Sequence, residues 1–532
     1  MKRTLVTLLS LLALFTIISC QKDATGDGSQ FRATMEPTAD GKTVLSGMAL
    51  NWVSGDRVAI YGTAGCGIYQ ATPQTPATVA TLNNVSGETG DGPFRAFYPA
   101  SLTSDGATIT LPAGQTYVEN SINEFPMYAE SATNQLAFKN LCGVLKLHLT
   151  KANTNITSIT VKANAEICGD YTVSYMNDVP QLSYTGNGSK TVTMACPTAQ
   201  DISDGKDFYI VLPATFDSLK SITLTTDDGR TCTKTVKSNV CINVQRSTVK
   251  TIMLNNSDMY YEPLPEGALP GLFTINQSGD FVRFSQGNLQ YQASTNIWRF
   301  AENQWDFVGQ HSSIYDSIGG TVSGSDNRFI SSTYSGWIDL FGWGTGNNPT
   351  QHSTDFRDYQ PTIDWGVNAI SNGGNQPDMW RTLSISEWAY LFNRRPTITN
   401  LGTNNARFVR GRVNGVKGVI LFPNVYYHPD GLPTPTDINN FDIIDWNDNL
   451  FTSSQWAEME ENGAVFLPAA GFRAGTRVIV TGNSGCYYST TPTNSPDQSG
   501  GRFMEYGRYY LDPYSYNFRQ YGQSVRLIMS IN

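Results

Sequence analysis

Hydrophobic and polar positions alternate along most of the first half of the chain, as they do in β-strands. Phe208–Ala214 is a continuous apolar run with the length of a strand buried on both faces. Asp228 and Gly229 stand between two β-forming runs, where a hairpin needs its turn. No sustained helical period is present, so this half is predicted to be mainly β. Other short alternating or β-branched runs predict further strands: residues 107–111, 158–161, 191–194 and 221–225.

A helical pattern stands out in the second half of the chain. Ser384 and Glu387 have the spacing of a capping box, in which a hydroxyl and a carboxylate satisfy free backbone N–H groups. Trp388, Leu391 and Phe392 then fall on one face. A capped amphipathic helix is therefore predicted to begin after Ser384.

A second helix is predicted from about Ser454 to Glu461 and ends before Gly463, with Trp456 and Met459 facing inward. Strands are expected at residues 464–467 and 524–528. Two helices against short, irregular strands indicate an α+β module.

Composition changes sharply near residue 270. Sixteen of the 22 arginines and nine of the ten tryptophans lie beyond it, but only one of the 14 lysines, Lys417. The segment 257–271 is rich in proline and glycine and suits an extended linker. The length of the chain exceeds what one core organises. We therefore expect two β-sandwiches at residues 31–140 and 141–256, then the linker, then one module over 272–532.

The first 20 residues have the pattern of a lipoprotein signal peptide. Lys2 and Arg3 precede an apolar run that is too short to span a membrane, and residues 17–20 read as a lipobox ending at Cys20. Cys20 is then the lipid-modified end of the mature chain, which is anchored to a membrane through a short tether, residues 21–30. We expect an outer-membrane protein that faces the cell surface, although these residues do not separate inner from outer membrane.

Charge and cysteine usage exclude several classes of ligand. A net charge of −9 argues against nucleic acid as a partner. No CxxC pair or Cys/His cluster is present, so neither a metal nor another cofactor is expected. Seven cysteines follow Cys20, and an oxidising compartment permits disulfides whose pairing the sequence leaves open. Cys486 stands alone in the second half and is expected to be a small buried hydrophobe.

Several motifs in the first half resemble the fimbrillin-like (Mfa-like) lipoproteins of gut and oral anaerobes. The resemblance implies two transthyretin-like β-sandwiches and, in some members, assembly into pili by β-strand donation. The tether before the first strand is short, and residues 524–531 leave no spare tail to donate, so a pilus-tip-like or free-standing role is expected over a stalk subunit. The motifs are Phe31–Met35, Lys42–Leu45, Asn51–Tyr61, Phe94–Ala100 and Thr110–Gln115.

The second half resembles the C-terminal paralogous module of gut-bacterial surface lipoproteins, which is similar to the C-type-lectin-like fold of formylglycine-generating enzymes. Those enzymes work through active-site cysteines, and this half has only Cys486, so no enzymatic activity is expected. The motifs are Phe284–Tyr291, Trp298–Asn303, Gly336–Gly344, Trp380–Leu383, Glu387–Trp388, Gly463–Arg473 and Gly522–Leu527.

Neither a catalytic nor a calcium-binding role is favoured for the acidic motifs in this half. Asp442 and Asp445 could in principle act as an acid/base pair, but acidic loop residues are usually solvated turn formers. Gln376–Asp378 and Trp446–Asp448 match strings that bind calcium in some lectins. About seventy residues separate them here, so coincidence is favoured over a calcium site.

A carbohydrate site is the preferred reading of the tryptophans, because flat indoles stack on sugar rings. Trp343 is the first choice, since the glycine-rich stretch after it is expected to leave its face accessible. The same surface is predicted to include Asn347, Asn348, His352, Arg357 and Asp364.

The sequence thus favours a surface adhesin or pilus-tip-like subunit whose C-terminal module binds a host or microbial glycan or protein. Pilus subunits are further possible partners. The alternatives are a glycan-capturing lipoprotein for nutrient uptake and, less favoured, a hydrolase of unrecognised type.

Overall fold

The structure, a computed structural model, describes residues 30–36, 50–122, 124–150, 152–255, 259–309, 326–360, 362–494 and 499–531. The predicted signal peptide, Cys20, most of the tether and the Lys42–Leu45 motif lie outside these ranges. The described chain consists mostly of strands, as the sequence predicts. None of its described helices is long and apolar enough to cross a membrane.

Seven strands of the first segment form a closed barrel, where a sandwich of two open sheets was expected. The barrel closes because the short β1 hydrogen-bonds on both edges, antiparallel to β4 and parallel to β9. Aromatic side chains such as Trp52 and Phe138 fill its interior. In barrel order the strands are β1 (Phe31–Met35), β4 (Val79–Gly87), β3 (Cys66–Ala71), β2 (Arg57–Tyr61), β5 (Phe94–Tyr98), β8 (Met127–Ser131) and β9 (Gln135–Asn140).

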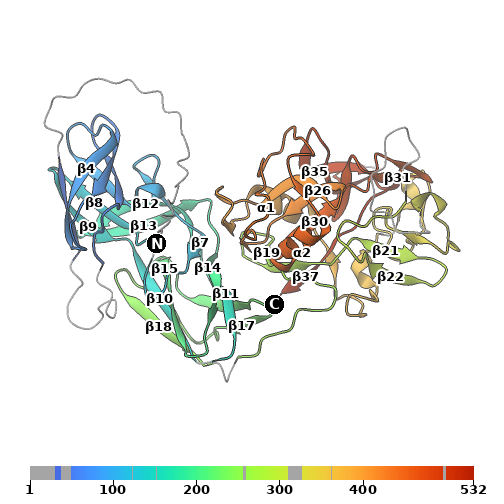
Figure 1. Ribbon diagram of the computed structural model, residues 1–532, viewed down its shortest axis with the longest axis horizontal. Helices are drawn as coiled ribbons and strands as arrows, with labels where there is room; N and C mark the ends of the chain where they lie inside the picture. The colour runs from blue at the N-terminus through green and yellow to red at the C-terminus, as the bar shows by residue number, and fades with distance from the viewer. Residues whose placement is uncertain are drawn as a thin grey trace, which may run out of the picture.

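Three further sheets, called the central sheets below, are coloured cyan to light green in Figure 1. The apolar faces of the first two form a second core that includes Leu147 and Phe208, whereas Ile109 and Tyr171 of the third belong to the core of the barrel. The first sheet has the order β15 (Lys206–Pro213), β10 (Cys142–Leu149), β18 (Val249–Leu254). The second is β17 (Thr231–Thr235), β16 (Leu219–Thr226), β11 (Asn155–Ala163), β14 (Thr191–Asp201), β7 (Gly114–Thr116). The third is β13 (Val179–Gly186), β12 (Gly169–Met176), β6 (Thr108–Leu111).

Two of these strands precede residue 140, the predicted boundary between the two sandwiches. β6 pairs with β12, and β7 pairs with β14, although both precede β8 and β9 of the barrel in sequence. A short 3-10 helix, η1 (Ala100–Leu102), leads out of the barrel toward them. The barrel and the central sheets are thus joined by exchanged strands as well as by the chain itself.

The described residues of the C-terminal half, yellow to red in Figure 1, form six short sheets. Three core clusters hold them together, with most of the tryptophans inside. The sheets are β19 (Phe273–Thr274), β20 (Phe281–Phe284), β37 (Leu527–Ile531), β24 (Arg381–Thr382); β22 (Ile297–Phe300), β21 (Leu289–Gln292), β23 (Trp337–Ile338); β25 (Ile398–Thr399), β28 (Val425–Tyr426); β29 (Leu450–Phe451), β26 (Phe408–Val413), β27 (Val416–Leu421), β30 (Val465–Pro468); β32 (Arg477–Ile479), β31 (Phe472–Ala474), β36 (Tyr521–Gly522); and β33 (Gly485–Pro492), β34 (Gly500–Tyr506), β35 (Leu511–Phe518).

Both predicted helices are present in this half. Helix α1 (Ile385–Asn393) begins with the expected capping box, in which Ser384 and Glu387 bond each other's backbone N–H groups. Helix α2 (Ser453–Glu461) has a second capping box between Thr452 and Gln455. The described part of this half also contains three short 3-10 helices: η3 (Asn327–Phe329), η4 (Phe356–Asp358) and η5 (Trp365–Val367). The assignment of this α+β half to a C-type-lectin-like fold stays a prediction.

Residues of the central sheets bond directly to the C-terminal half. Lys162 forms an ion pair with Asp280 at 2.8 Å, and the Arg283 guanidinium donates to the Gly229 carbonyl at 2.6 Å. Burial of Leu269 anchors the end of the predicted linker. The two halves are therefore in contact and not joined by the linker alone.

All seven described cysteines are free thiols. Cys486 is buried, which confirms its predicted role as a small hydrophobe.

Among the described residues of the C-terminal half, five arginines are at most 2% exposed: Arg283, Arg395, Arg410, Arg473 and Arg526. Burial lowers the pKa of each guanidinium group. All five donate to neutral oxygens, most of them backbone carbonyls of loops. Buried carbonyls outside regular strands need such donors, and the five N–H groups of an arginine can serve several at once.

A buried carboxyl, Asp339, holds two loop segments of the same half together. It accepts hydrogen bonds from the Val308 backbone N–H and from the Asn327 amide, each at 2.8 Å. Its pKa is raised to about 7 because burial disfavours the charged form. In an unfolded chain such a carboxyl titrates near pH ~3.9.

This raised pKa predicts a pH dependence of stability. Between about pH 4 and about pH 7 the folded chain keeps a proton that the unfolded chain releases, so the free energy of unfolding should fall as pH rises. We expect Asp339→Asn to remove this component of the slope. Urea unfolding followed by tryptophan fluorescence measures it, because nine of the ten tryptophans lie in this half. The exposed Asp430→Asn is the control, and equal slopes in both variants would contradict the role of Asp339.

Candidate binding surfaces

Trp343, the first choice for a sugar platform, is buried. Only 4% of its surface is exposed, and its indole N–H donates to the Ser489 carbonyl at 2.8 Å. The Arg519 guanidinium covers its ring at 4.3 Å, and a Cβ on Gly501 would meet the ring at 2.6 Å. The prediction that flanking glycines leave this face accessible is therefore wrong. Strand β34 covers it, and the indole supports the sheet formed by β33, β34 and β35.

Asp364 is engaged in local structure. It caps the 3-10 helix η5 through the Gly366 N–H at 2.8 Å and accepts from the Thr382 hydroxyl at 3.2 Å. These bonds explain why an aspartate precedes Trp365 without any ligand.

The other four predicted residues are exposed. Asn347 and Asn348 lie in the turn after Trp343, and His352 bonds its own loop through the Thr350 carbonyl. Arg357 forms a fork with Asp355 and lowers the pKa of that carboxyl to about 2. Their role in ligand binding stays a prediction.

The loop that carries Arg357 reaches an aromatic surface on strand β35. Phe356, in η4, stacks on Phe518 with ring centroids 6.3 Å apart and an angle of 25°. Phe518 is the last of three exposed aromatic residues at alternate positions of β35, after Tyr514 and Tyr516. Sequence reasoning missed this surface, although Tyr-Ser-Tyr-Asn-Phe has the alternation of a strand.

Residues of the acidic motifs form contacts within the chain. Trp446 is buried, and the Asp442 carbonyl accepts from Arg410. Asp445 bonds the backbone of Asn447 within its own turn. Over the described ranges no group of three or more His, Cys, Asp or Glu side chains is arranged to hold a metal ion.

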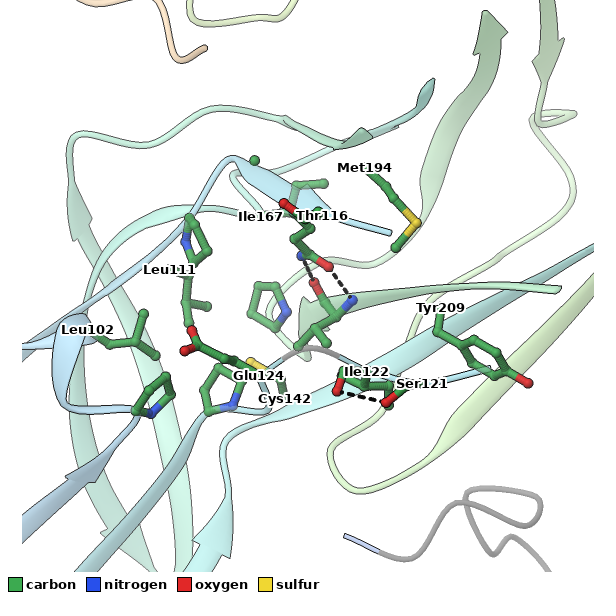
Figure 2. Close-up of a pocket in the computed structure, with 17 residues that line it drawn as sticks. Leu102, Leu111, Thr116, Ser121, Ile122, Glu124, Cys142, Ile167, Met194 and Tyr209 are labelled. Carbon is green, nitrogen blue, oxygen red and sulfur yellow. Dashed lines mark hydrogen bonds between the residues drawn. The ribbon is translucent and has the colours of Figure 1, made fainter. Parts of the chain in front are cut away.

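A cavity of about 130 Å³ lies where the barrel meets the central sheets (Figure 2). The side-chain amide of Gln115, from β7, pairs with the backbone of Val211 in β15 at 2.7 and 2.9 Å and forms part of its wall. Leu111, Ile167 and Met194 line it, with Cys142 at one side. Ligand sites usually have volumes of roughly 300–1,000 Å³, so this cavity is too small to be a strong candidate.

A salt bridge fixes the end of strand β1. The Arg246 guanidinium donates to the two carboxylate oxygens of Glu36 at 2.7 and 3.0 Å. The Asn140 N–H and the Ser247 hydroxyl also donate to this carboxylate. Burial alone would raise the pKa of Glu36, but these bonds outweigh it and the pKa is lowered. The strand that closes the barrel is thereby tied to the central sheets.

No protein-family model matches the chain. No curated protein matches it either. Among solved structures, a candidate cell adhesion protein from Bacteroides uniformis is 17% identical with a TM-score of 0.28, over 44% of this chain and 96% of that one. A fimbrial protein from Bacteroides ovatus is 8% identical with a TM-score of 0.21, over 94% and 98%. A fimbrial assembly protein from Parabacteroides distasonis is 9% identical with a TM-score of 0.23, over 48% and 95%. Scores this low carry no argument about fold or function.

The Glu36 salt bridge predicts how readily β1 detaches. Glu36→Gln replaces charge-assisted bonds with neutral ones and should cost about 1–3 kcal/mol locally. Trypsin should then cleave faster after the exposed Arg32 of β1, as followed by mass spectrometry of the full chain. Glu88→Gln changes an exposed carboxylate of the same barrel and should leave the rate unchanged. Equal cleavage in the two variants would show that the salt bridge does not hold β1.

Proposed function

We propose that the chain is a surface-held, non-enzymatic adhesin or pilus-tip-like subunit. Cys20 carries the lipid that anchors it to the outer membrane. The first half is the fimbrillin-like part, with its predicted division near residue 140, and the module over 272–532 binds a glycan or protein receptor. The motif resemblances in both halves support this proposal.

The observation that carries the tip-like role is the position of strand β37. It lies inside its sheet, with β20 on one edge and β24 on the other. Leu527 and Ile528 are fully buried. Donating this strand to a neighbouring subunit would open the sheet and expose this core, which is costly. A subunit of this kind can accept a strand or present a receptor site more easily than it can donate one.

A cell-adhesion experiment tests the proposal. Cells that produce the full chain should bind immobilised mucin or extracellular-matrix protein better than cells that lack it. Cys20→Ala should release the chain and abolish the gain, because without the lipid nothing holds the protein on the cell. Cys241→Ala removes an exposed thiol elsewhere and should have no effect.

Two results would contradict the proposal. One is equal adhesion of cells with and without the chain. The other is a chain that proteinase added to intact cells cannot reach, because an adhesin must face outward.

A further inference from the structure

We propose that the outer face of β35 is a stacking platform for a neutral oligosaccharide. This inference rests on the proposed function and names the receptor class and the residues that meet it. Tyr514, Tyr516 and Phe518 are 50%, 70% and 47% exposed. Because they alternate along one strand, all three rings project from the same face of the sheet.

The spacing of the rings suits a chain of sugars. Strands rise about 3.4 Å per residue, so neighbouring rings are separated by roughly 7 Å and the three span roughly 14 Å. This length exceeds a single sugar ring. The platform therefore favours several consecutive sugar units whose apolar faces lie along the strand.

Neighbouring side chains hold the outer rings in place. The Arg502 guanidinium lies 4.5 Å from the centre of the Tyr514 ring, and β34 pairs Arg502 with Tyr516 across the sheet. Phe356 stacks on Phe518 at the other end. Rings fixed before binding lose less side-chain entropy when a ligand arrives.

The sheet itself is supported from below. Trp343 packs under Gly501, and the Arg519 guanidinium that covers this indole donates to the Gly500 carbonyl at 3.3 Å. Arg410 donates to the carbonyls of Gly507 and Tyr510, in the hairpin that leads into β35. Buried groups thus fix both ends of the strand that carries the platform.

The chemistry of the face favours a glycan over a protein core. Over residues 499–531 every exposed large hydrophobic side chain is aromatic, and these are Tyr509, Tyr510, Tyr514, Tyr516 and Phe518. Protein interfaces are also enriched in aromatic side chains, but methionine is enriched there as well, and no methionine is exposed over these residues. Flat rings beside hydrogen-bonding groups suit sugars, which have apolar faces and hydroxyl edges.

The charges around the face indicate a neutral ligand. Arg502 lies over the Tyr514 ring, and the Asp512 carboxylate accepts from the Tyr514 backbone N–H. Arg508 and Glu505 contact Tyr509 and Tyr510 in the preceding hairpin. Single-stranded nucleic acid also stacks on aromatic rings, but it needs a positively charged groove. The balance of charge here and the net charge of −9 oppose such a polyanion.

Affinity electrophoresis of the full chain tests the platform. The gels contain xylan, glucomannan, mixed-linkage β-glucan or desialylated mucin, with polygalacturonate as the acidic comparison. We expect retardation by at least one neutral polymer. Tyr516→Ala should weaken this binding about tenfold, since it removes the most exposed ring. Tyr516→Trp keeps a flat ring and should stay within about twofold.

Tyr260→Ala is the matched control, because Tyr260 is 73% exposed but lies in the segment between the halves. It should bind like the original chain. Unfolding curves of all variants should coincide, since each change is at the surface. Binding that Tyr516→Ala leaves intact, binding to polygalacturonate alone, or retardation by none of the polymers would overturn the platform.

The cell-adhesion assay separates this inference from the function beneath it. If cells with the original chain adhere and cells with Tyr516→Ala adhere equally, the platform is wrong and the adhesin role stands. If the chain binds a polymer through Tyr516 but confers no adhesion, the platform stands and the adhesin role is wrong.

Discussion

Hydrogen bonds from buried guanidinium groups to loop carbonyls are the constraint on which the C-terminal half depends. Its strands are short, several of them with only two residues, so much of its backbone cannot be satisfied by sheet ladders. Arg473 shows the solution, since it donates to the carbonyls of Leu340, Gln351 and Gly475. A lysine has three donors on one atom and cannot span such a set. This explains why the half is rich in arginine and holds a single lysine.

The same bonds position the surface that we propose for binding. Arg410 joins the hairpin before β35 to the loop that contains Asn440 and Asp442. Trp343 and Arg519 support the other end of the sheet. An aromatic face that stays exposed without collapsing into a core needs a rigid base, and here that base consists of buried cations and an indole. Trp343, which suggested sugar binding, thus supports the sheet beneath the aromatic face.

Local signals in the sequence predicted local structure well. The capping box at Ser384 and the buried Cys486 were both predictable, because each depends on a few neighbouring residues. The barrel closure and the pairing of β6 with β12 were not, because no local pattern names a distant partner strand. The prediction that Trp343 is accessible failed for the same reason. Its flanking glycines were visible in the sequence, but the strand that covers it comes much later in the chain. The alternation of Tyr514, Tyr516 and Phe518 was visible as a strand, but not which face would be left open.

Amide hydrogen exchange in Arg410→Lys tests the role of the buried arginines most directly. The backbone N–H groups of Leu511 and Ile444 bond across the segments that Arg410 joins, and that of Gly507 bonds Tyr510 within the hairpin. Mass spectrometry of the full chain should show these segments exchanging faster in Arg410→Lys, while the central sheets stay protected. The exposed Arg477→Lys should match the original chain. Unchanged exchange over residues 440–444 and 507–511 would contradict the account, because the guanidinium would then not be what holds the loops beneath the aromatic face.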